Sequence, residues 1–229
     1  MRILITNDDG IDAPGLEALR AAVGCLAGEI VVAAPALPHS GCGHRVTTDR
    51  PIRVAEVGPG RYRVEGTPAD CVRIALARIV PDAALVVSGI NAGGNLGADV
   101  HHSGTVAAAR EAALHGLPAL AASHYHRRGT TIDWGRAAGW VAEILRSLPD
   151  RGHEPGTFWN VNLPDLPAAA PAPGVVECQV DASPFDLVYR LDTDGWHYES
   201  SYHERPRLPG GDIDVCFAGG IALSRLRTI

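Results

Sequence analysis

The chain opens with Arg2-Ile3-Leu4-Ile5-Thr6-Asn7-Asp8-Asp9-Gly10, a short apolar run that leads into turn-forming residues. The apolar residues lack helical spacing, so we predict a buried strand over residues 2–6 at the centre of an α/β sheet. Asp8 and Asp9 then lie in the loop at the carboxyl end of this strand. In open α/β sheets, ligands bind at this edge.

The two adjacent carboxylates indicate a cation. Neighbouring Asp side chains repel each other and resist removal from water, so a site that keeps both ionised usually supplies a positive charge. A hard divalent metal fits their oxygens. The alternative is an ordinary polar turn over residues 7–10, with Asp9 or Asp12 capping a helix that begins near Pro14, because surface turns are often rich in Asn, Asp and Gly.

The next residues predict a βαβ unit. Apolar residues at helical spacing predict a helix over residues 15–27, and a second apolar run predicts a strand over residues 29–35. Such units are nearly always parallel and right-handed. Further strands are predicted over residues 83–88, 117–123 and 157–164, and further helices over residues 68–79, 103–115 and 134–148. Thr67, Pro68 and Asp70 predict a capping box at the start of the first of these helices.

Two hairpins complete the predicted elements. Residues 52–65 alternate around a Gly-Pro-Gly turn, and residues 188–202 alternate around Asp194-Gly195. The second hairpin has little core of its own, so we expect it to pack on the main domain or on a neighbouring subunit. We therefore expect a catalytic core over residues 1–164, and a linker, a hairpin arm and a C-terminal segment that returns to the core over residues 165–229.

Composition narrows the class of protein. A net charge of −6 without a basic run argues against binding a nucleic-acid polymer, and no apolar run approaches the length of a membrane span. The five cysteines form no CxxC pair, which argues against a disulfide framework or a cysteine-rich zinc site. The chain has no lysine, which excludes a Walker or Schiff-base lysine. Because the first strand begins at Arg2, we expect no signal peptide and a cytoplasmic location.

Other oxygen-bearing residues follow the strands that neighbour the first one. Ser40 comes after the second strand, and Asn91 lies in a glycine-rich loop, residues 89–97, after a later one. This loop matches neither GxGxxG nor a P-loop. Carboxylate, hydroxyl and amide oxygens suit Mg²⁺, Mn²⁺ or Ca²⁺. The sequence therefore predicts a hard-metal site at Asp8, Asp9, Ser40 and Asn91.

A helix start supplies a candidate anion site. Ser103-Gly104-Thr105 opens an alanine-rich helix, whose first N–H groups and two hydroxyls could bind phosphate. The alternative is that Ser103 or Thr105 is only the N-cap of the helix. A cation and an anion-binding helix start together indicate phosphate chemistry.

These residues also carry a resemblance to a known family. The chain resembles the SurE (survival protein E) family of metal-dependent phosphatases, which act on nucleoside monophosphates. The matching motifs run in the family's order: Asn7-Asp8-Asp9-Gly10 with Ala13-Pro14-Gly15, Ala34-Pro35 with Ser40-Gly41, Gly66-Thr67-Pro68 with Asp70-Cys71-Val72, Ser88-Gly89-Ile90-Asn91 with Asn95-Leu96-Gly97, Ser103-Gly104-Thr105, and Asn160-Val161-Asn162-Leu163-Pro164.

The resemblance implies a Rossmann-like three-layer core with a mostly parallel sheet, and one Mg²⁺ or Mn²⁺ per subunit. It implies hydrolysis of nucleoside 5′- and 3′-monophosphates, and some members also trim short polyphosphate. Family members are dimers or tetramers that exchange C-terminal arms, so we expect a homodimer or homotetramer formed through residues 188–202.

Roles within the site follow as hypotheses. Asp8 and Asp9 are the expected catalytic residues, and the sequence leaves open which of them acts as base or as nucleophile. The expected phosphate-binding residues are Gly41, Asn95, Ser103, Gly104 and Thr105. His101 or His102 could act as general acid, or both could simply be exposed.

The sequence departs from the family pattern beside the site. Ala36 replaces a usual acidic residue, and Cys42-Gly43-His44-Arg45 replaces a run rich in Asn and Ser. This loop borders the substrate, so base or sugar preference stays open. A binding module without turnover is the alternative function. No G-x-S-x-G elbow or Ser/His/Asp order supports an enzyme for substrates other than phosphates.

Overall fold

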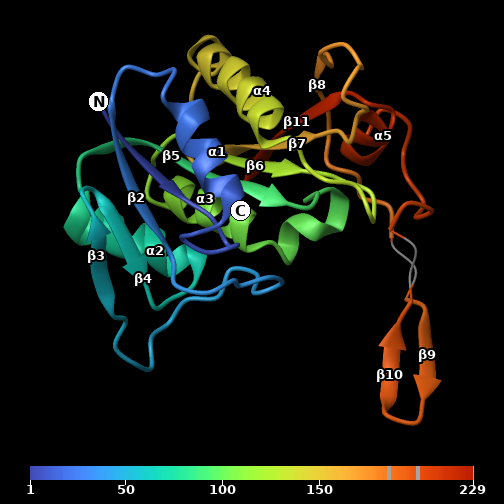
Figure 1. Cartoon of the computed structure of the whole chain (residues 1–229), viewed down its shortest axis with the longest axis horizontal. Helices are drawn as coiled ribbons and strands as arrows, with labels where there is room; N and C mark the ends of the chain where they lie inside the picture. Colours follow the sequence, from blue (N-terminus) through green and yellow to red (C-terminus); the bar gives the residue numbers. More distant parts are fainter. Residues whose placement is uncertain (185–186, 200–201, 229) are drawn as a thin grey trace.

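A nine-stranded sheet forms the centre of the computed structural model, which describes residues 1–184, 187–199 and 202–228 (Figure 1). The strands, in spatial order, are β3 (Val54–Gly58), β4 (Arg61–Val64), β2 (Glu29–Pro35), β1 (Arg2–Thr6), β5 (Ala83–Ala92), β6 (Ala119–His124), β7 (Thr157–Leu163), β11 (Ile221–Arg227) and β8 (Val175–Glu177). The six strands from β4 to β7 pair in parallel, whereas β3 and β11 run antiparallel to their neighbours β4 and β7.

Helices cover both faces of the sheet. Helices α1 (Pro14–Val23) and α4 (Trp134–Ser147) pack on one face, and α2 (Pro68–Ile74) and α3 (Gly104–Leu114) pack on the other. Alternation along β1 explains this, because Ile3 and Ile5 lie in the first apolar cluster and Leu4 lies in the second. The predicted α/β fold with a Rossmann-like, mostly parallel core is therefore confirmed.

Shorter helical segments complete the chain. These are a π-helical turn (Ala75–Ile79), two 3₁₀ turns (Gly97–His101 and Pro149–Arg151) and α5 (Asp212–Phe217). Across the described ranges, no helix is both long enough and apolar enough to pass through a bilayer.

The order of the strands reverses direction at β1. The chain passes from β1 to β2 on one side, and β5 later pairs with β1 on the other side, with Thr6 opposite Ser88. The carboxyl ends of β1 and β5 therefore flank a topological switch point, which is where open α/β sheets bind ligands.

Local predictions hold at most element boundaries. Strand β2 spans the predicted residues, and the capping box at Thr67 and Asp70 is present. The prediction is wrong at residues 89–92, which continue β5 instead of starting a loop. Gly89 explains the difference, because its φ of +133° accompanies a register shift between Ser88 and Asn91 that carries the strand onward.

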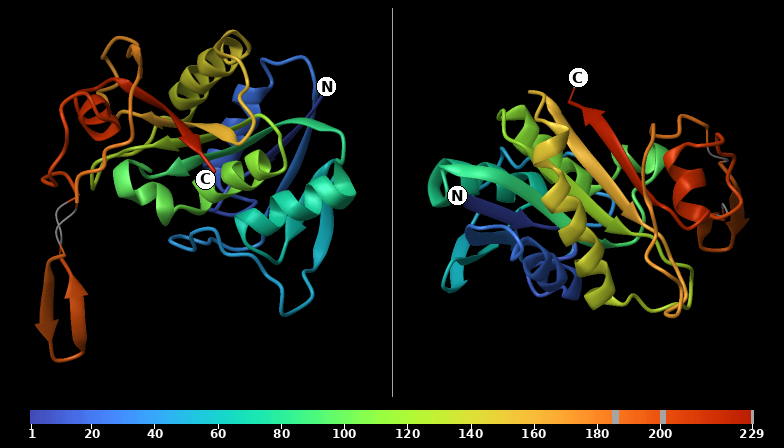
Figure 2. Two further views of the ribbon diagram at one scale, coloured as in Figure 1. Left: turned by 180° about the vertical axis from the view of Figure 1, so that it is seen from behind. Right: turned by 90° about the horizontal axis from the view of Figure 1, so that it is seen from above.

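The C-terminal hairpin, β9 (Tyr189–Asp192) with β10 (Gly195–Tyr198), projects from the α/β body (Figures 1 and 2). The hairpin predicted over residues 188–202 is therefore confirmed at β9 and β10, whereas residues 200 and 201 lie outside the described residues. Every residue of β9 is exposed, so this strand does not pack on the main domain. By contrast, β11 returns to the central sheet and pairs with β7.

Gly89 offers a test of the packing at the switch point. A Cβ at this residue would lie 2.2 Å from the carbonyl oxygen of Ala122, in a backbone conformation that L side chains rarely adopt. We expect Gly89→Ala to lower the free energy of unfolding by about 3 kcal/mol. The matched control is Gly139→Ala in α4, because no atom of a neighbouring segment lies within 4 Å of a Cβ added there. This variant should raise the free energy of unfolding by up to about 1 kcal/mol. Urea unfolding of both variants measures these changes. Equal free energies of unfolding for the two variants would contradict the prediction.

Candidate active site

The loops after β1, β2 and β5 meet at the switch point. The Asp9 Oδ2 atom accepts a hydrogen bond from the Ala92 backbone N–H at 3.2 Å, which joins the β1 loop to the end of β5. The backbone N–H of His39 donates to the Asp8 carbonyl oxygen at 2.8 Å, which joins the β2 loop to the same residues. The predicted metal ligands Asp8, Asp9 and Asn91 therefore lie on adjoining segments.

Asp8 is held at the start of α3. Its carboxylate is buried, and its Oδ1 atom accepts a hydrogen bond from the Thr105 hydroxyl. Burial raises the pKa of Asp8 to about 6, and the charge of Asp9 adds to this rise, although hydrogen bonds from the Thr105 side chain and backbone oppose it. An ionised Asp8 is therefore costly in this pocket unless a positive charge accompanies it.

Asp9 is only half-buried. Burial raises the pKa of its carboxyl as well, against the hydrogen bond from the Ala92 backbone. Two neighbouring carboxyls with raised pKa values are typical of functional sites, where the fold holds charged groups close together for a purpose other than stability.

The chemistry of these donors fits a hard cation. The Asn91 Nδ2 donates to the Gly93 carbonyl at 2.8 Å, so the amide oxygen is the atom of this side chain that could coordinate an ion. Nearby, the Asn7 Oδ1 is buried and has no hydrogen-bond partner within the described ranges. Carboxylate and amide oxygens are the ligands that Mg²⁺ and Mn²⁺ prefer. Asp8, Asp9 and Asn91 could therefore hold such an ion.

Ser40 lies on the exposed rim of the same edge. Its loop is tied down on either side, since His39 bonds to Asp8 and the Gly43 N–H donates to the His102 carbonyl at 2.9 Å. Gly41, next to Ser40, has a φ of +69° and nothing within 4 Å of an added Cβ. The structure thus leaves Ser40 and Gly41 open to a ligand, and their roles stay predictions.

The helix start at Ser103-Gly104-Thr105 carries two different hydroxyl roles. Ser103 is the N-cap, and its Oγ accepts a hydrogen bond from the Val106 N–H at 3.0 Å. Thr105 instead donates to Asp8. Gly104 allows the close approach, because a Cβ there would lie 2.8 Å from the Asp8 Cβ and 3.0 Å from the Cys42 sulfur. The carboxylate of Asp8 therefore occupies part of the helix start that the sequence assigns to phosphate.

Asn95 is buried in a network that sequence reasoning missed. The Asn95 side chain is buried, and its Nδ2 donates to the Ser123 hydroxyl at 2.7 Å. The backbone carbonyl of Asn95 accepts hydrogen bonds from the side-chain amides of Asn160 and Asn162, each at 3.0 Å. Asn160 and Asn162 alternate on a strand that is buried throughout. Two polar residues on one face of such a strand are the signal that could have identified this support for the glycine loop.

The surroundings of the site are open. His101 and His102 are both exposed, which agrees with the alternative that they are surface histidines without a catalytic role. A cavity of about 360 Å³ opens beside Asp9. It is lined by Asp9, Gly10, Ile11, Asp12, Ala13, Pro14, Gly15, Ala36, Pro38, Ala92 and Trp134. A second cavity, of about 290 Å³, lies at the opposite edge of the sheet with an apolar lining that includes Leu85, Phe158 and Trp159.

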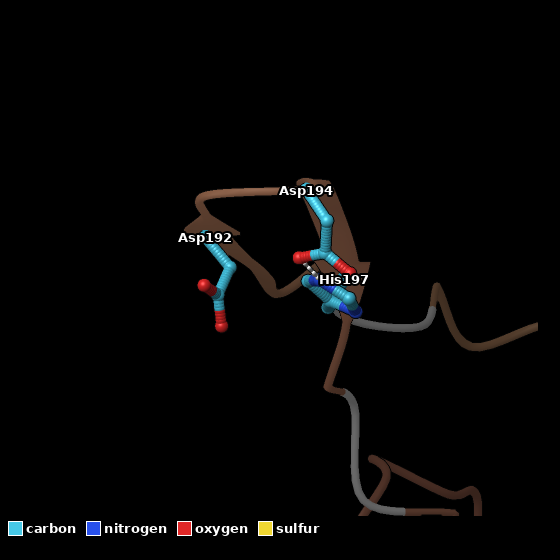
Figure 3. Close-up of side chains that lie close together, drawn as sticks. All are labelled: Asp192, Asp194 and His197. Atoms are coloured by element: carbon cyan, nitrogen blue, oxygen red, sulfur yellow. Dashed lines mark hydrogen bonds and ion pairs between the residues drawn. The ribbon is translucent and has the colours of Figure 1, made fainter.

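A further group of possible metal ligands lies far from this edge. Asp192, Asp194 and His197 place their ligand atoms within 4.8 Å of one another on the C-terminal hairpin (Figure 3). His197 is hydrogen-bonded to Asp194 at 2.9 Å, and Asp192 is ion-paired with Arg190. These pairs account for the grouping without an ion, so we do not assign it to the active site.

The raised pKa of Asp8 sets a testable pH dependence of stability. The group binds its proton more tightly in the folded chain, where its pKa is about 6, than at its ordinary value of 3.8. Proton binding by Asp8 therefore stabilises the folded chain. This stabilisation is fully present below about pH 4 and is lost as the pH rises through 6. In EDTA, Asp8→Asn should therefore gain about 2 to 3 kcal/mol over the unchanged chain between pH 4 and pH 7.5.

Urea unfolding across this pH range measures the effect. Asp49→Asn is the control, because Asp49 is an exposed carboxylate on the loop before β3. Its difference from the unchanged chain should stay constant over the range. A constant difference for Asp8→Asn as well would show that the Asp8 carboxyl is not perturbed in the folded chain.

Comparisons with known proteins agree with the geometry. The sequence profile of the family described as Survival protein SurE matches residues 3–182. A Nostoc sp. protein, alr3139, named as a candidate 5′-nucleotidase, is 52% identical over 227 residues, which cover 99% of this chain and all of that protein. The 5′-nucleotidase SurE of Geobacter sulfurreducens is 43% identical over 200 residues, which cover 86% of this chain and 76% of the relative.

A solved structure extends the likeness to the fold. The crystal structure of the SurE protein from Aquifex aeolicus superposes with a TM-score of 0.84 at 31% sequence identity, covering all of this chain and 94% of that one. The resemblance read from the motifs is confirmed: the chain belongs to the SurE (survival protein SurE) family.

Proposed function

We propose that this chain is a divalent-metal-dependent phosphomonoesterase that hydrolyses nucleoside 5′-monophosphates. The observation that carries the proposal is the pair Asp8 and Asp9, two carboxyls with raised pKa values at the switch point of the sheet. Relatives named as 5′-nucleotidases SurE support the substrate class. A cytoplasmic location, expected from the sequence, is part of the proposal.

Asp8, Asp9, Asn91 and Ser40 would hold one Mg²⁺ or Mn²⁺. When bound, such an ion supplies positive charge for the phosphoryl oxygens and orients the attacking water. The fit rests on the all-oxygen donor set and on the two carboxyls whose ionisation is costly without a cation.

The chain's own groups divide the remaining work. The Thr105 hydroxyl donates a hydrogen bond to the Oδ1 atom of Asp8, so that the Asp8 carboxylate keeps one orientation during turnover. The Ser103 oxygen accepts the Val106 N–H, which leaves the hydroxyl hydrogen available to a phosphate oxygen. The N–H of Gly104, at the positive end of α3, adds a second donor for the same phosphate.

Asp9 is the better placed of the two carboxyls to take a proton from water. Among the described residues, Asp9 accepts a hydrogen bond only at its Oδ2 atom, from the Ala92 N–H, whereas Asp8 is more deeply buried and bound to Thr105. A raised pKa brings a carboxylate closer to the strength that a general base needs near neutral pH. We therefore assign Asp9 as base and Asp8 as an anchor.

The substrate would reach the site from the exposed rim. Ser40 and Gly41 are exposed, and the cavity of about 360 Å³ beside Asp9 is large enough for a small ligand. An open rim admits phosphate esters at different positions of the sugar. We therefore include nucleoside 3′-monophosphates and short polyphosphate among the proposed substrates.

The hairpin supports a proposal about assembly. Tyr189 pairs with Tyr198 and Leu191 pairs with Trp196 across the two strands, so these four side chains share one face. The face is exposed, with Leu191 at 62% and Trp196 at 68% of full exposure. Large exposed apolar faces usually mark contact surfaces between proteins. We propose that a second copy of the chain covers this face in a homodimer or homotetramer.

Phosphate release tests the activity. We expect release from nucleoside 5′- and 3′-monophosphates in Mg²⁺ or Mn²⁺, and none in EDTA, with p-nitrophenyl phosphate as a generic substrate. Asp9→Asn should lower kcat at least about 100-fold, since it removes both a ligand and the base. No release by the folded, metal-loaded chain from any substrate would favour a binding module instead.

Light scattering after size exclusion tests the assembly. The double variant Leu191→Asp and Trp196→Asp should be monomeric, because two carboxylates would have to be buried in the contact. Thr193→Asp, in the turn between the strands, is the control and should keep the oligomer. A monomeric unchanged chain, or an oligomeric double variant, would contradict this proposal.

A further inference from the structure

Glu111 is a buried carboxylate that the proposed reaction does not use. Its side chain is only 5% exposed and lies on α3, on the side of the sheet where α2 also packs. It accepts hydrogen bonds from His44 Nε2 at 2.6 Å and from His115 Nε2 at 3.0 Å, and Arg73 lies 3.6 Å away. Burial by itself raises the pKa of Glu111, but the bonds from His44 and His115 and the charge of Arg73 bring it below its ordinary value.

The three partners come from different places. His115 follows α3 directly, and Arg73 lies on α2. His44 is different, because it belongs to the loop after β2 that carries Ser40. The shortest of the three contacts thus reaches from a helix in the core to the loop that carries a proposed metal ligand.

The same helix also holds Asp8. Thr105, in the first turn of α3, donates to Asp8, and Glu111 lies six residues further along, about 9 Å by the rise of an α-helix. One rigid element therefore contacts the β1 loop through Thr105 and the β2 loop through Glu111. These two contacts add to the backbone bond from His39 to Asp8, which links the same two loops directly.

The loop needs such a contact, because its own backbone is permissive. Gly41 and Gly43 have φ values of +69° and +57°, and Ser40 and Gly41 are exposed. Glycines allow many backbone conformations, so a ligand on this segment is poorly oriented unless neighbouring residues hold it. Backbone bonds at His39 and Gly43 restrain the loop, and the His44 side chain adds the tie to the core.

We propose that His44 and Glu111 form a positioning pair that holds Ser40 in place for the divalent metal. The inference rests on the proposed metal site. A hydrogen-bonded partner behind a ligand orients it, and loss of such a partner typically lowers metal affinity by 10 to 100-fold. Neither residue touches substrate in this proposal, and both act through the loop.

Mn²⁺ binding to the full chain without substrate tests the pair, with free Mn²⁺ measured by electron paramagnetic resonance. His44→Ala should raise the Kd for Mn²⁺ about 10-fold. His115→Ala is the matched control, because it removes a hydrogen bond to the same carboxylate but does not touch the loop. It should leave the Kd unchanged. His44→Gln keeps a side-chain N–H donor and should restore much of the affinity. Thermal unfolding followed by circular dichroism verifies that each variant is folded.

The outcomes separate this inference from the proposed function. Weaker Mn²⁺ binding in His44→Ala alone, with recovery in His44→Gln, supports the positioning pair. Unchanged affinity in His44→Ala, or an equal loss in His115→Ala, overturns the pair while leaving the metal site intact. Absence of Mn²⁺ binding to the unchanged chain overturns both the metal site and the pair.

Discussion

The hydrogen bond from Thr105 to the buried carboxylate of Asp8 is the contact on which the site depends. A carboxylate withdrawn from water must find donors inside the protein, and the first turn of α3 supplies the hydroxyl and the backbone N–H of Thr105. The contact requires Gly104, because a side chain there would collide with Asp8. It joins β1 to α3 at the point where the strand order reverses, and it thereby fixes the edge of the sheet where the other loops meet.

Function and stability oppose each other at this edge. Burial raises the pKa values of Asp8 and Asp9, and the charge of Asp9 adds to the rise at Asp8, so ionising both groups in the folded chain has an energetic cost. A bound divalent cation would remove much of that cost, which links the proposed metal to the stability of the fold. The rest of the molecule compensates through an apolar core on both faces of the sheet. The apolar side chains Leu191 and Trp196 of the C-terminal hairpin, in contrast, are exposed.

Much of the fold could be predicted because its signals are local. Apolar runs without helical spacing marked the parallel strands, and the capping box at Thr67 and Asp70 marked the start of α2. Prediction failed where the decision was not local. Residues 89–92 look like a loop from their glycine and asparagine content, yet pairing with β6 extends the strand through them. The hairpin was identified from its turn, but nothing in its own residues excluded packing on the main domain.

The sequence by itself determined that Asp8, Asp9 and Asn91 lie at one edge, because the carboxyl ends of neighbouring parallel strands meet there. Only the tertiary structure decided which side chains form hydrogen bonds to Asp8 and to the loop that carries Ser40. Thr105 is 97 residues from Asp8, and Glu111 is 67 residues from His44. Such pairs leave no periodic or capping signal in the chain, because side chains so far apart in sequence meet only after the helices have packed on the sheet.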